Sequence, residues 1–420
     1  MRCRMNVIVV SSKFPPEYSG SGLRIYNTYQ RLQDKYGINY KVLTSSVTKN
    51  INTTYKLNGI TIRLVSWKPF HSILLLSYQS EYKKFDYLVN LLGKVLYRFD
   101  FFIEALFTFI FHFRLRKWTD LIHVIGNVNV TAATLIFAKI YNKEIIYEVV
   151  NFKNNEDFNP LEYYEPFFIK WFYGKGFKEK WQVITISMAL KKLCESHNLN
   201  LNIFHRPNPV DDTKFYPVSK SKKYKLRKNL TSFSTDDYVI CNISKFMPQK
   251  NQIILVNALQ VLPIQYKLLM VGPIVNSGPL AIRDEQYLLN IKQLVASLGL
   301  QDRVIIKTGF FNNVDEYYQL SDVFAFPTTD EALGTPMLEC LSCAVPVVMT
   351  DIKGVSDTWI DNGINGYLCT LSISDFAEKI LLSEKLDRQT LIIESKKLMD
   401  FVSIDVIDAQ YLYFFNNLSK

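Results

Sequence analysis

Short β-branched runs alternate with longer stretches of helical periodicity along the chain, and this alternation constrains the fold more than any other feature. In the N-terminal half, strands are predicted at residues 5–10, 40–44, 121–125 and 144–150, and helices at 23–35 and 130–141. The C-terminal half repeats the pattern, with strands at 238–243, 266–271, 304–308, 323–326 and 345–349, and helices at 251–262, 284–298, 314–319 and 335–342. Such alternation predicts parallel sheets with helices on both faces.

A proline-rich, charged stretch separates the two halves. It contains Pro207, Pro209 and Pro217 and runs into a lysine-rich segment, a composition that is typical of linkers. A chain of 420 residues is long enough for roughly two to three domains. We therefore expect two similar α/β domains with a cleft between them, over residues 1–205 and 219–398, joined by a linker over residues 206–218.

Composition narrows the classes of function without choosing one. Hydrophobic residues make up 48% of the chain and charged residues 21%, which excludes a disordered or collagen-like protein. The formal net charge of +10 favours anionic partners, and nucleotides, phospholipid surfaces and nucleic acid all remain open on charge alone. The C-x-x-C at Cys340 and Cys343 lacks the second pair or histidine cluster that would complete a zinc site.

Two segments bear on where the protein works. The first apolar run, residues 7–10, is too short for a secretory signal, so we expect a cytoplasmic protein. Residues 73–118 are apolar, aromatic and basic, but Asp100 and Glu104 interrupt the run and leave it too short to span a membrane. The segment is either an in-plane amphipathic helix that binds an anionic membrane surface or a buried helix with a basic end.

The most informative stretch covers residues 321–351. A predicted buried strand is followed by a loop with Glu331, after which Gly334 permits a tight turn. Thr335 can then cap a helix that carries Glu339 in its first turns. Ligands of doubly wound sheets bind at the carboxyl ends of strands, and free N–H groups at a helix start suit a phosphate. A ligand with a phosphate group is therefore expected here.

This stretch resembles the E-x7-E signature of family 4 glycosyltransferases, whose GT-B fold has two Rossmann-like, doubly wound domains facing across a cleft. Other segments are similar to family motifs in the same order along most of the chain: Phe14-Pro15-Pro16 with Gly20-Ser21-Gly22, Asp120 to Val124, Asn208 to Asp211 with Phe215 and Pro217, Val271-Gly272-Pro273, Thr308-Gly309-Phe310 and Asp361 to Tyr367. The resemblance also implies that a C-terminal helix, residues 399–420, returns to the N-terminal domain.

The resemblance implies a role for each of several residues. Glu331 would contact hydroxyls of the donor sugar and Glu339 the ribose hydroxyls, which suits carboxylates because they only accept hydrogen bonds. Backbone near Phe310 would bind the base. Glycines in the first domain would let its backbone approach the diphosphate or the acceptor. The remaining expected donor-binding residues are Gly20, Gly22, Leu333, Gly334 and Thr335.

Two departures from the family pattern fall on residues expected at the site. Where the family has an arginine and a lysine on the diphosphate, this chain has Lys245 and Lys250. Lysine keeps the charge but lacks the planar fork of arginine, and we expect both lysines to stabilise the leaving diphosphate. The family histidine after the strand at 144–150 is replaced by Asn151, a candidate to position the acceptor. His123 is either a second such residue or a structural histidine.

The resemblance implies retaining, hexosyltransferase-type transfer from a nucleotide-diphosphate sugar to a saccharide or lipid-linked acceptor, as in surface polysaccharide synthesis. It further implies that no metal ion is needed, since cations and a helix dipole take that role. Three alternatives remain: a weak or inactive nucleotide-sugar binder of the same fold, an inverting GT-B enzyme or epimerase, and a Rossmann oxidoreductase. The last is disfavoured because Gly20 and Gly22 lack the third glycine of the dinucleotide fingerprint. Nucleic-acid binding rests on charge alone.

Overall fold

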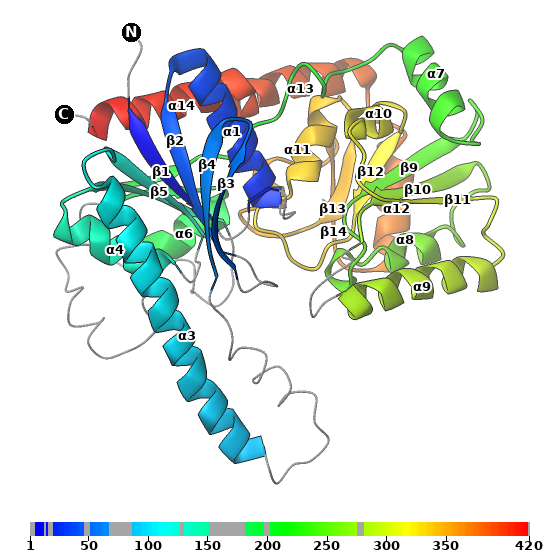
Figure 1. The fold of residues 1–420 in the computed structure, drawn as a ribbon. Helices are drawn as coiled ribbons and strands as arrows, with labels where there is room; N and C mark the ends of the chain where they lie inside the picture. The colour runs from blue at the N-terminus through cyan, green and yellow to red at the C-terminus, as the bar shows by residue number, and fades with distance from the viewer. Residues whose placement is uncertain are drawn as a thin grey trace. The chain divides into compact units, whose positions relative to one another are not determined.

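The computed structural model describes residues 5–11, 14–15, 20–45, 51–66, 86–126, 130–150, 181–196, 202–274 and 281–418. The chain forms two compact units (Figure 1). Unit 1 consists of Met1–Ile186, Leu190–Arg206 and Tyr411–Lys420, and unit 2 of Ser187–Ala189 and Pro207–Gln410. The main passages of the chain between the units therefore follow Arg206 and Gln410.

Unit 1 is built on a sheet with the strand order β3-β4-β2-β1-β5-β6-β7-β8. Neighbouring strands are parallel except β3 and β4, which form an antiparallel hairpin. The strands are β1 (Asn6–Ser11), β2 (Asn39–Thr44), β3 (Ile51–Leu57), β4 (Ile60–Ser66), β5 (Leu121–Ile125), β6 (Glu144–Val149), β7 (Trp181–Thr185) and β8 (Asn202–His205). The helices are α1 (Gly20–Tyr36), α3 (Asp86–Leu115), α4 (Thr131–Ile140), most of α6 (Met188–Ser196) and the end of α14 (Ile404–Leu418).

Unit 2 has a fully parallel sheet in the order β11-β10-β9-β12-β13-β14. Its strands are β9 (Tyr238–Ile243), β10 (Tyr266–Gly272), β11 (Val304–Thr308), β12 (Val323–Phe326), β13 (Val347–Thr350) and β14 (Gly366–Cys369). Its helices are α7 (Lys220–Leu230), η3 (Pro248–Lys250), α8 (Ile253–Ala258), α9 (Ala281–Ser297), α10 (Val314–Gln319), α11 (Thr335–Ser342), η4 (Ser356–Thr358), α12 (Ile373–Ser383) and α13 (Arg388–Val402).

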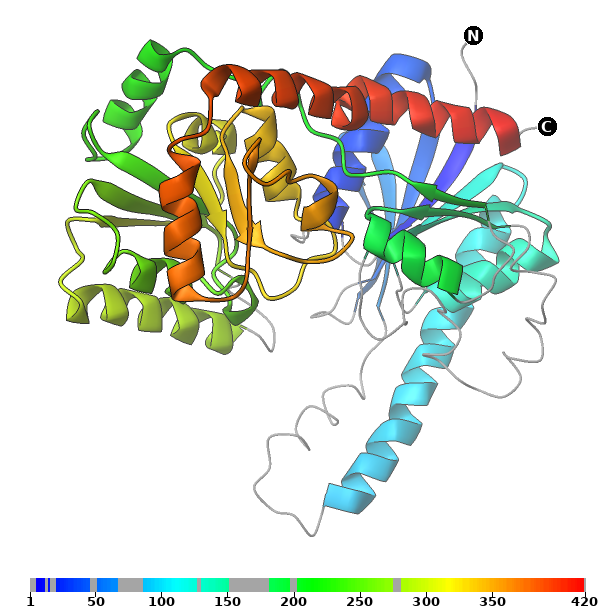
Figure 2. The same ribbon diagram turned by 180° about the vertical axis from the view of Figure 1, so that it is seen from behind.

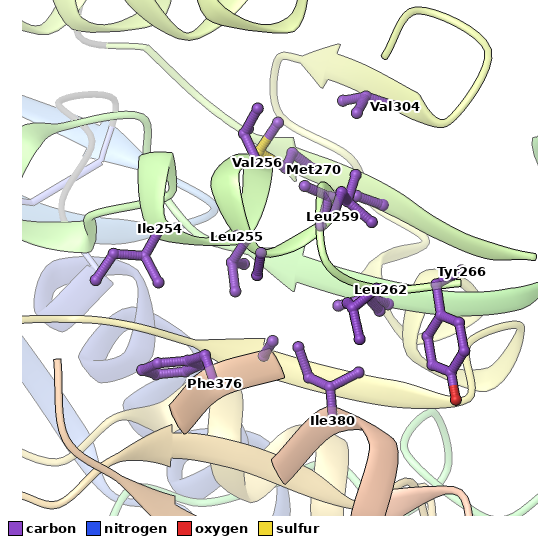
Figure 3. Close-up of a cluster of buried hydrophobic side chains, with 14 of the residues drawn as sticks. Ile254, Leu255, Val256, Leu259, Leu262, Tyr266, Met270, Val304, Phe376 and Ile380 are labelled. Carbon is purple, nitrogen blue, oxygen red and sulfur yellow. The ribbon is translucent and has the colours of Figure 1, made fainter. Parts of the chain in front are cut away.

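The core of unit 2 packs against the sheet, and the loops that follow the strands of this sheet carry the candidate site. Every residue of the central strands β12 and β13 is buried, as expected for parallel strands covered on both faces. Leu255 of α8 and the nearby Leu262 lie toward Phe376 and Ile380 of α12 in a cluster of buried apolar side chains (Figure 3). Phe376 and Ile380 are four residues apart, so one face of α12 supplies both contacts.

The predicted fold class is confirmed, since both units are α/β with sheets that are parallel apart from one hairpin. The hairpin was not predicted, although Asn58 and Gly59 join its strands with positive φ angles of 48° and 80°. This Asn-Gly pair is the preferred two-residue hairpin turn. The predicted helix at 251–262 is wrong in length, because α8 ends at Ala258 and turns follow.

The glycine segment at the start of α1 is also corrected by the structure. The expectation was a loop that ends at Gly22 before a helix from residue 23. Instead, α1 begins at Gly20, so Gly20 and Gly22 form part of its first turn. Gly20 is exposed and Gly22 is buried. The two glycines therefore belong to the helix and not to the loop before it.

The apolar, basic segment at 73–118 contains one long helix, α3, which Figures 1 and 2 show from opposite sides. Residues 73–85 of the segment lie outside the described residues. Near its end, α3 packs on α4, where His112 Nε2 lies 2.9 Å from Thr134 Oγ1 and the rings of Phe109 and Phe137 meet edge to face. Among the described residues, no helix has both the length and the apolarity needed to cross a membrane.

Candidate active site

The candidate site of unit 2 begins in the loop between β12 and α11. Gly334 lies directly before α11 with a positive φ of 74°, a conformation that glycine adopts without the strain other residues incur. The glycine thus turns the chain into the helix, whose first residue is Thr335. The side chain of Leu333, the residue before Gly334, is buried. The Oγ1 of Thr335 also accepts a hydrogen bond of 2.8 Å from Asn208 Nδ2.

Glu331, in the same loop, forms an ion pair with Lys250. Lys250 comes from η3, after β9, and its ammonium also lies 5.1 Å from the centre of the Phe326 ring. Burial raises the pKa of Glu331, and the charge of Lys250 opposes that rise. The structure therefore brings together two residues for which the sequence predicts a catalytic role, from positions 81 residues apart.

Further hydrogen bonds hold the two loops in register around this ion pair. The side-chain amide of Gln249 donates to the backbone oxygen of Asp330 at 2.8 Å, and the Thr329 N–H donates to the backbone oxygen of Gln249 at 2.9 Å. The end of β10 also lies close to the residues that follow β9. A Cβ on Gly272 would meet the backbone oxygen of Ser244 at 1.9 Å, so only glycine fits there. The pairing of Lys250 with Glu331 therefore rests on a fixed backbone.

Lys245 lies in a different electrostatic setting from Lys250. Its ammonium is 3.6 Å from Asp284 Oδ2 on α9 and is about one-third exposed. Asp284 is fully buried and also pairs with Arg283 at 2.6 Å. Asp284 was not predicted from the sequence, because it lies 39 positions from Lys245 and belongs to no motif. Its role here is to direct the Lys245 side chain toward α9.

Glu339 is the most strongly perturbed carboxyl group of the site. It lies in α11, and Tyr318 of α10 donates a hydrogen bond to its Oε2 at 3.2 Å. Burial raises the pKa of Glu339 to about 7, against the opposing effect of the Tyr318 hydroxyl. Tyr318 was not predicted from the sequence, because the contact depends on how α10 packs against α11. Near neutral pH, Glu339 can therefore change between donor and acceptor of a hydrogen bond.

Phe310 follows the turn at the end of β11 and is one of the most exposed aromatic residues of unit 2, at 64%. The turn depends on Gly309, whose φ is 141° and whose N–H donates to the backbone oxygen of Gly272 at 2.9 Å. The turn is thereby fixed beside the end of β10. Phe310 therefore lies near the carboxyl ends of β10 and β11.

Of the two predicted positioning residues in unit 1, the structure describes His123. His123 is fully buried in β5, where the Tyr29 hydroxyl lies 2.8 Å from its Nδ1 and Glu148 Oε2 lies 3.4 Å from its Nε2. Burial lowers the pKa of His123, although Glu148 favours the charged form. These contacts favour a structural role for His123. Asn151 lies outside the described residues.

In the described part of the chain, no three His, Cys, Asp or Glu side chains come together in a way that could hold a metal ion. The cations near the candidate site are the side chains of Lys245 and Lys250. The arrangement offers two lysine ammonium groups, two carboxyl groups and the N–H groups at the start of α11. These groups can bind hydroxyls and neutralise a phosphate.

Residues 224–397, which make up most of unit 2, match the family model described as glycosyl transferases group 1. Most of unit 2 therefore has the sequence of a group 1 glycosyltransferase domain. N-acetyl-alpha-D-glucosaminyl L-malate synthase of Bacillus anthracis is 29% identical over 222 residues, which cover 51% of this chain and 53% of that protein. The capsular polysaccharide biosynthesis glycosyltransferase CapM of Staphylococcus aureus is 24% identical over 222 residues, with 50% and 54% coverage. The match thus spans about half the length of these relatives.

Solved structures resemble the whole chain. HepE of Anabaena, in complex with UDP and glucose, has a TM-score of 0.70 and 18% identity and covers 99% of this chain and 100% of that one. Sucrose-phosphate synthase of Thermosynechococcus elongatus has a TM-score of 0.71 and 17% identity, with 99% coverage of both chains. At such identities the likeness concerns the fold alone, and it confirms the expected GT-B architecture.

We expect nucleotide binding to depend on pH, because the sequence predicts that Glu339 binds the ribose hydroxyls and burial raises its pKa. Hydroxyl groups of a ribose bind best to the carboxylate, so protonation below about pH 7 should weaken binding. With a pKa near 7 in the free protein, about one-tenth of Glu339 is ionised at pH 6, and we expect the Kd for a nucleoside diphosphate to rise up to about tenfold between pH 8 and 6. Isothermal titration at several pH values measures this change.

Glu339→Gln should remove most of this pH dependence, while Glu394→Gln on α13 should leave it intact. The free energy of unfolding should change in the opposite direction and decrease as the pH rises. Because the pKa of Glu339 is higher in the folded protein than in the unfolded chain, its stabilising effect is full below the unfolded value and is lost as the pH rises through about 7. An equally steep binding profile in Glu339→Gln would contradict the assignment.

Proposed function

We propose that the chain is a retaining, hexosyltransferase-type glycosyltransferase that moves a sugar from a nucleotide-diphosphate sugar to a saccharide or lipid-linked acceptor in surface polysaccharide or glycan synthesis. The observation that carries the proposal is the pairing of Lys250 with Glu331 beside the start of α11. The match of residues 224–397 to the group 1 glycosyltransferase family supports it. So does the nucleotide sugar in a solved structure of the same fold, HepE with UDP-glucose.

In this proposal, Lys250 and Lys245 neutralise the diphosphate as it leaves. An ammonium group has three N–H donors, so Lys250 can bind a phosphate oxygen while it keeps its contact with Glu331. Charge stabilisation by preorganised groups is usually the main source of an enzyme's rate enhancement. Glu331 accepts hydrogen bonds from hydroxyls of the donor sugar, and Glu339 accepts them from the ribose. Gly20, Gly22, Phe310, Leu333, Gly334 and Thr335 complete the proposed donor site.

The proposed reaction needs no protein nucleophile. The bond between the anomeric carbon and the phosphate oxygen breaks, and its electron pair leaves with the nucleoside diphosphate. The acceptor hydroxyl attacks the anomeric carbon from the same face, and its proton passes to the leaving phosphate oxygen. The protein then contributes positioning and charge stabilisation. We propose that two lysines supply the positive charge without a metal ion, and no other cofactor enters the scheme.

The acceptor and the location follow from weaker evidence. One relative from Escherichia coli, 26% identical over 171 residues, is named an alpha-1,3-galactosyltransferase that acts on a diphosphoundecaprenol-linked sugar, which supports a lipid-linked acceptor. All the described cysteines are buried thiols without disulfides, as is usual in a reducing compartment. We therefore propose that the protein works in the cytoplasm, peripherally on the inner face of the membrane.

In the C-terminal half of α3, polar side chains are buried against the protein and large apolar side chains are exposed. This arrangement supports contact with an anionic membrane. The side chains that face the protein are polar and at most 2% exposed: Asp100, Glu104, Thr108 and His112. The side chains that face outward are large and apolar, and between 38% and 60% exposed: Phe99, Phe102, Leu106, Ile110 and Phe113. Burial lowers the pKa of His112 to about 3, so this inward face carries a neutral imidazole.

Cations continue this apolar stripe at the end of α3. Arg114 and Lys117 are exposed, and the guanidinium of Arg116 lies 4.1 Å from the centre of the Phe113 ring. The carboxylates of Asp100 and Glu104 are buried. The outward face therefore combines apolar and cationic groups, which suits a surface of anionic lipid. We propose that residues 73–118 hold the enzyme at such a surface.

The first test of the function is a donor screen with purified protein in EDTA. Nucleoside diphosphate release is measured for each nucleotide sugar, with and without a membrane lipid extract. We expect release from one donor, increased by the extract and unaffected by EDTA. Binding of nucleotide sugars without turnover of any of them would instead favour the alternative, a nucleotide-sugar binder without activity. That result would point to Lys245, since lysine replaces the forked arginine of the family there.

The membrane proposal predicts that the protein sediments with vesicles that contain anionic phosphatidylglycerol, and that rising salt releases it. Charge reversal at Arg114, Arg116 and Lys117 should abolish most of the binding, and so should Phe102→Ser with Leu106→Ser. The matched control is Ile282→Ser with Leu289→Ser on α9, where the side chains are also large, apolar and exposed but belong to unit 2. Unchanged sedimentation after charge reversal would exclude this surface.

A further inference from the structure

Unit 1 contains a buried cluster of charges centred on Glu148, near the end of β6. Its carboxylate forms ion pairs with Arg24 and with Arg206, the latter at 2.7 Å. The hydroxyl of Tyr411 donates to the same carboxylate at 3.3 Å. Glu148, Arg206 and Tyr411 are fully buried, and the side chain of Arg24 is 9% exposed.

The electrostatics of the cluster hold Glu148 in its charged form. Burial alone would raise the pKa of Glu148, but the guanidinium groups of Arg24 and Arg206 hold it well below its usual range. The guanidinium of Arg206 also lies 4.2 Å from the centre of the Tyr411 ring. A charge at this depth is stable only with its partners in place, so the members of the cluster keep one another in position.

Within the cluster, the partners of Glu148 come from the two main chain passages between the units and from the start of α1. Arg206 is the last residue before the chain passes from unit 1 to unit 2, and Tyr411 is the first residue after it returns. Arg24 lies in the first turns of α1, just after Gly20 and Gly22. One carboxylate thus contacts both chain passages and the start of α1.

We propose that Glu148 is a positioning residue that couples the two chain passages to the glycine-bearing start of α1. A displacement at either passage is transmitted through the Glu148 carboxylate to Arg24, and from there to the backbone of Gly20 and Gly22. The effect on catalysis rests on the proposed function, in which that backbone approaches the diphosphate or the acceptor. The coupling itself is a property of unit 1 and can be measured without any substrate.

The test compares three variants by amide hydrogen exchange. Glu148→Gln leaves two buried guanidinium groups without a counter-charge and can prevent folding, so the test uses variants at the ends of the cluster. Arg24→Gln leaves Arg206 opposite Glu148, and Tyr411→Phe removes one hydroxyl. The matched control is Tyr413→Phe, the same change at a side chain on α14 that is 61% exposed.

Coupling predicts reciprocal effects. Tyr411→Phe should increase the exchange rate at residues 24–28, whose N–H groups donate to the first turn of α1, by about threefold or more, and Arg24→Gln should do the same at residues 408–411. Tyr413→Phe should change neither. If each variant alters exchange only in its own helix, the contacts are local and the proposal is wrong.

Activity then separates this proposal from the proposed function. In an active enzyme, both variants should lower kcat by about tenfold through misplacement of the start of α1. A role in stability alone would lower the melting temperature without this change in kcat. Reciprocal exchange effects in a protein without transferase activity would leave the coupling intact and overturn the proposed function.

Discussion

The ion pair between Lys250 and Glu331 is the interaction on which the candidate active site depends. It joins the loop after β9 to the loop after β12, and each side chain is only about 15% exposed. A charge in such a place is costly without its partner, so each residue fixes the other. The contacts of Gln249 with the second loop and the close approach that Gly272 permits keep the backbone around the pair rigid. A preorganised cation beside a helix start results, which is what stabilisation of a leaving phosphate requires.

The two units put buried charge to different uses. In unit 2, buried or half-buried charges lie at the carboxyl ends of the strands, where a ligand can complete their hydrogen bonds. In unit 1, the Glu148 cluster is closed to solvent and connects segments of the chain to one another. Helix α3 is a third case, since it buries Asp100 and Glu104 and exposes Phe102 and Leu106. Each arrangement departs from the usual burial of apolar groups, and each occurs where we propose a contact with donor, acceptor or membrane.

The fold could be predicted from the sequence because the signal is local and repeated. Strand–helix alternation predicted the parallel strands of both sheets, and Gly334 marked the turn before α11. The prediction that Thr335 caps this helix was wrong, because Gly334 is the N-cap and no side chain caps the helix. The partners of the site residues could not be predicted, since Asp284 and Tyr318 reach Lys245 and Glu339 only through the packing of α9 and α10. The inward and outward faces of α3 likewise depend on its contacts with α4. The Asn58-Gly59 hairpin is different, because its turn signal was present in the sequence.

The central claim is that Lys250 stabilises the charge that develops on the leaving diphosphate, and its most direct test is the turnover of Lys250→Met. The account predicts that kcat falls by about 10²- to 10³-fold, as for loss of one preorganised donor in other enzymes. Lys353→Met, a change at a side chain that is 78% exposed, should keep the activity of the unmodified chain. Circular dichroism confirms that both variants fold. A folded Lys250→Met protein with undiminished kcat would contradict the account.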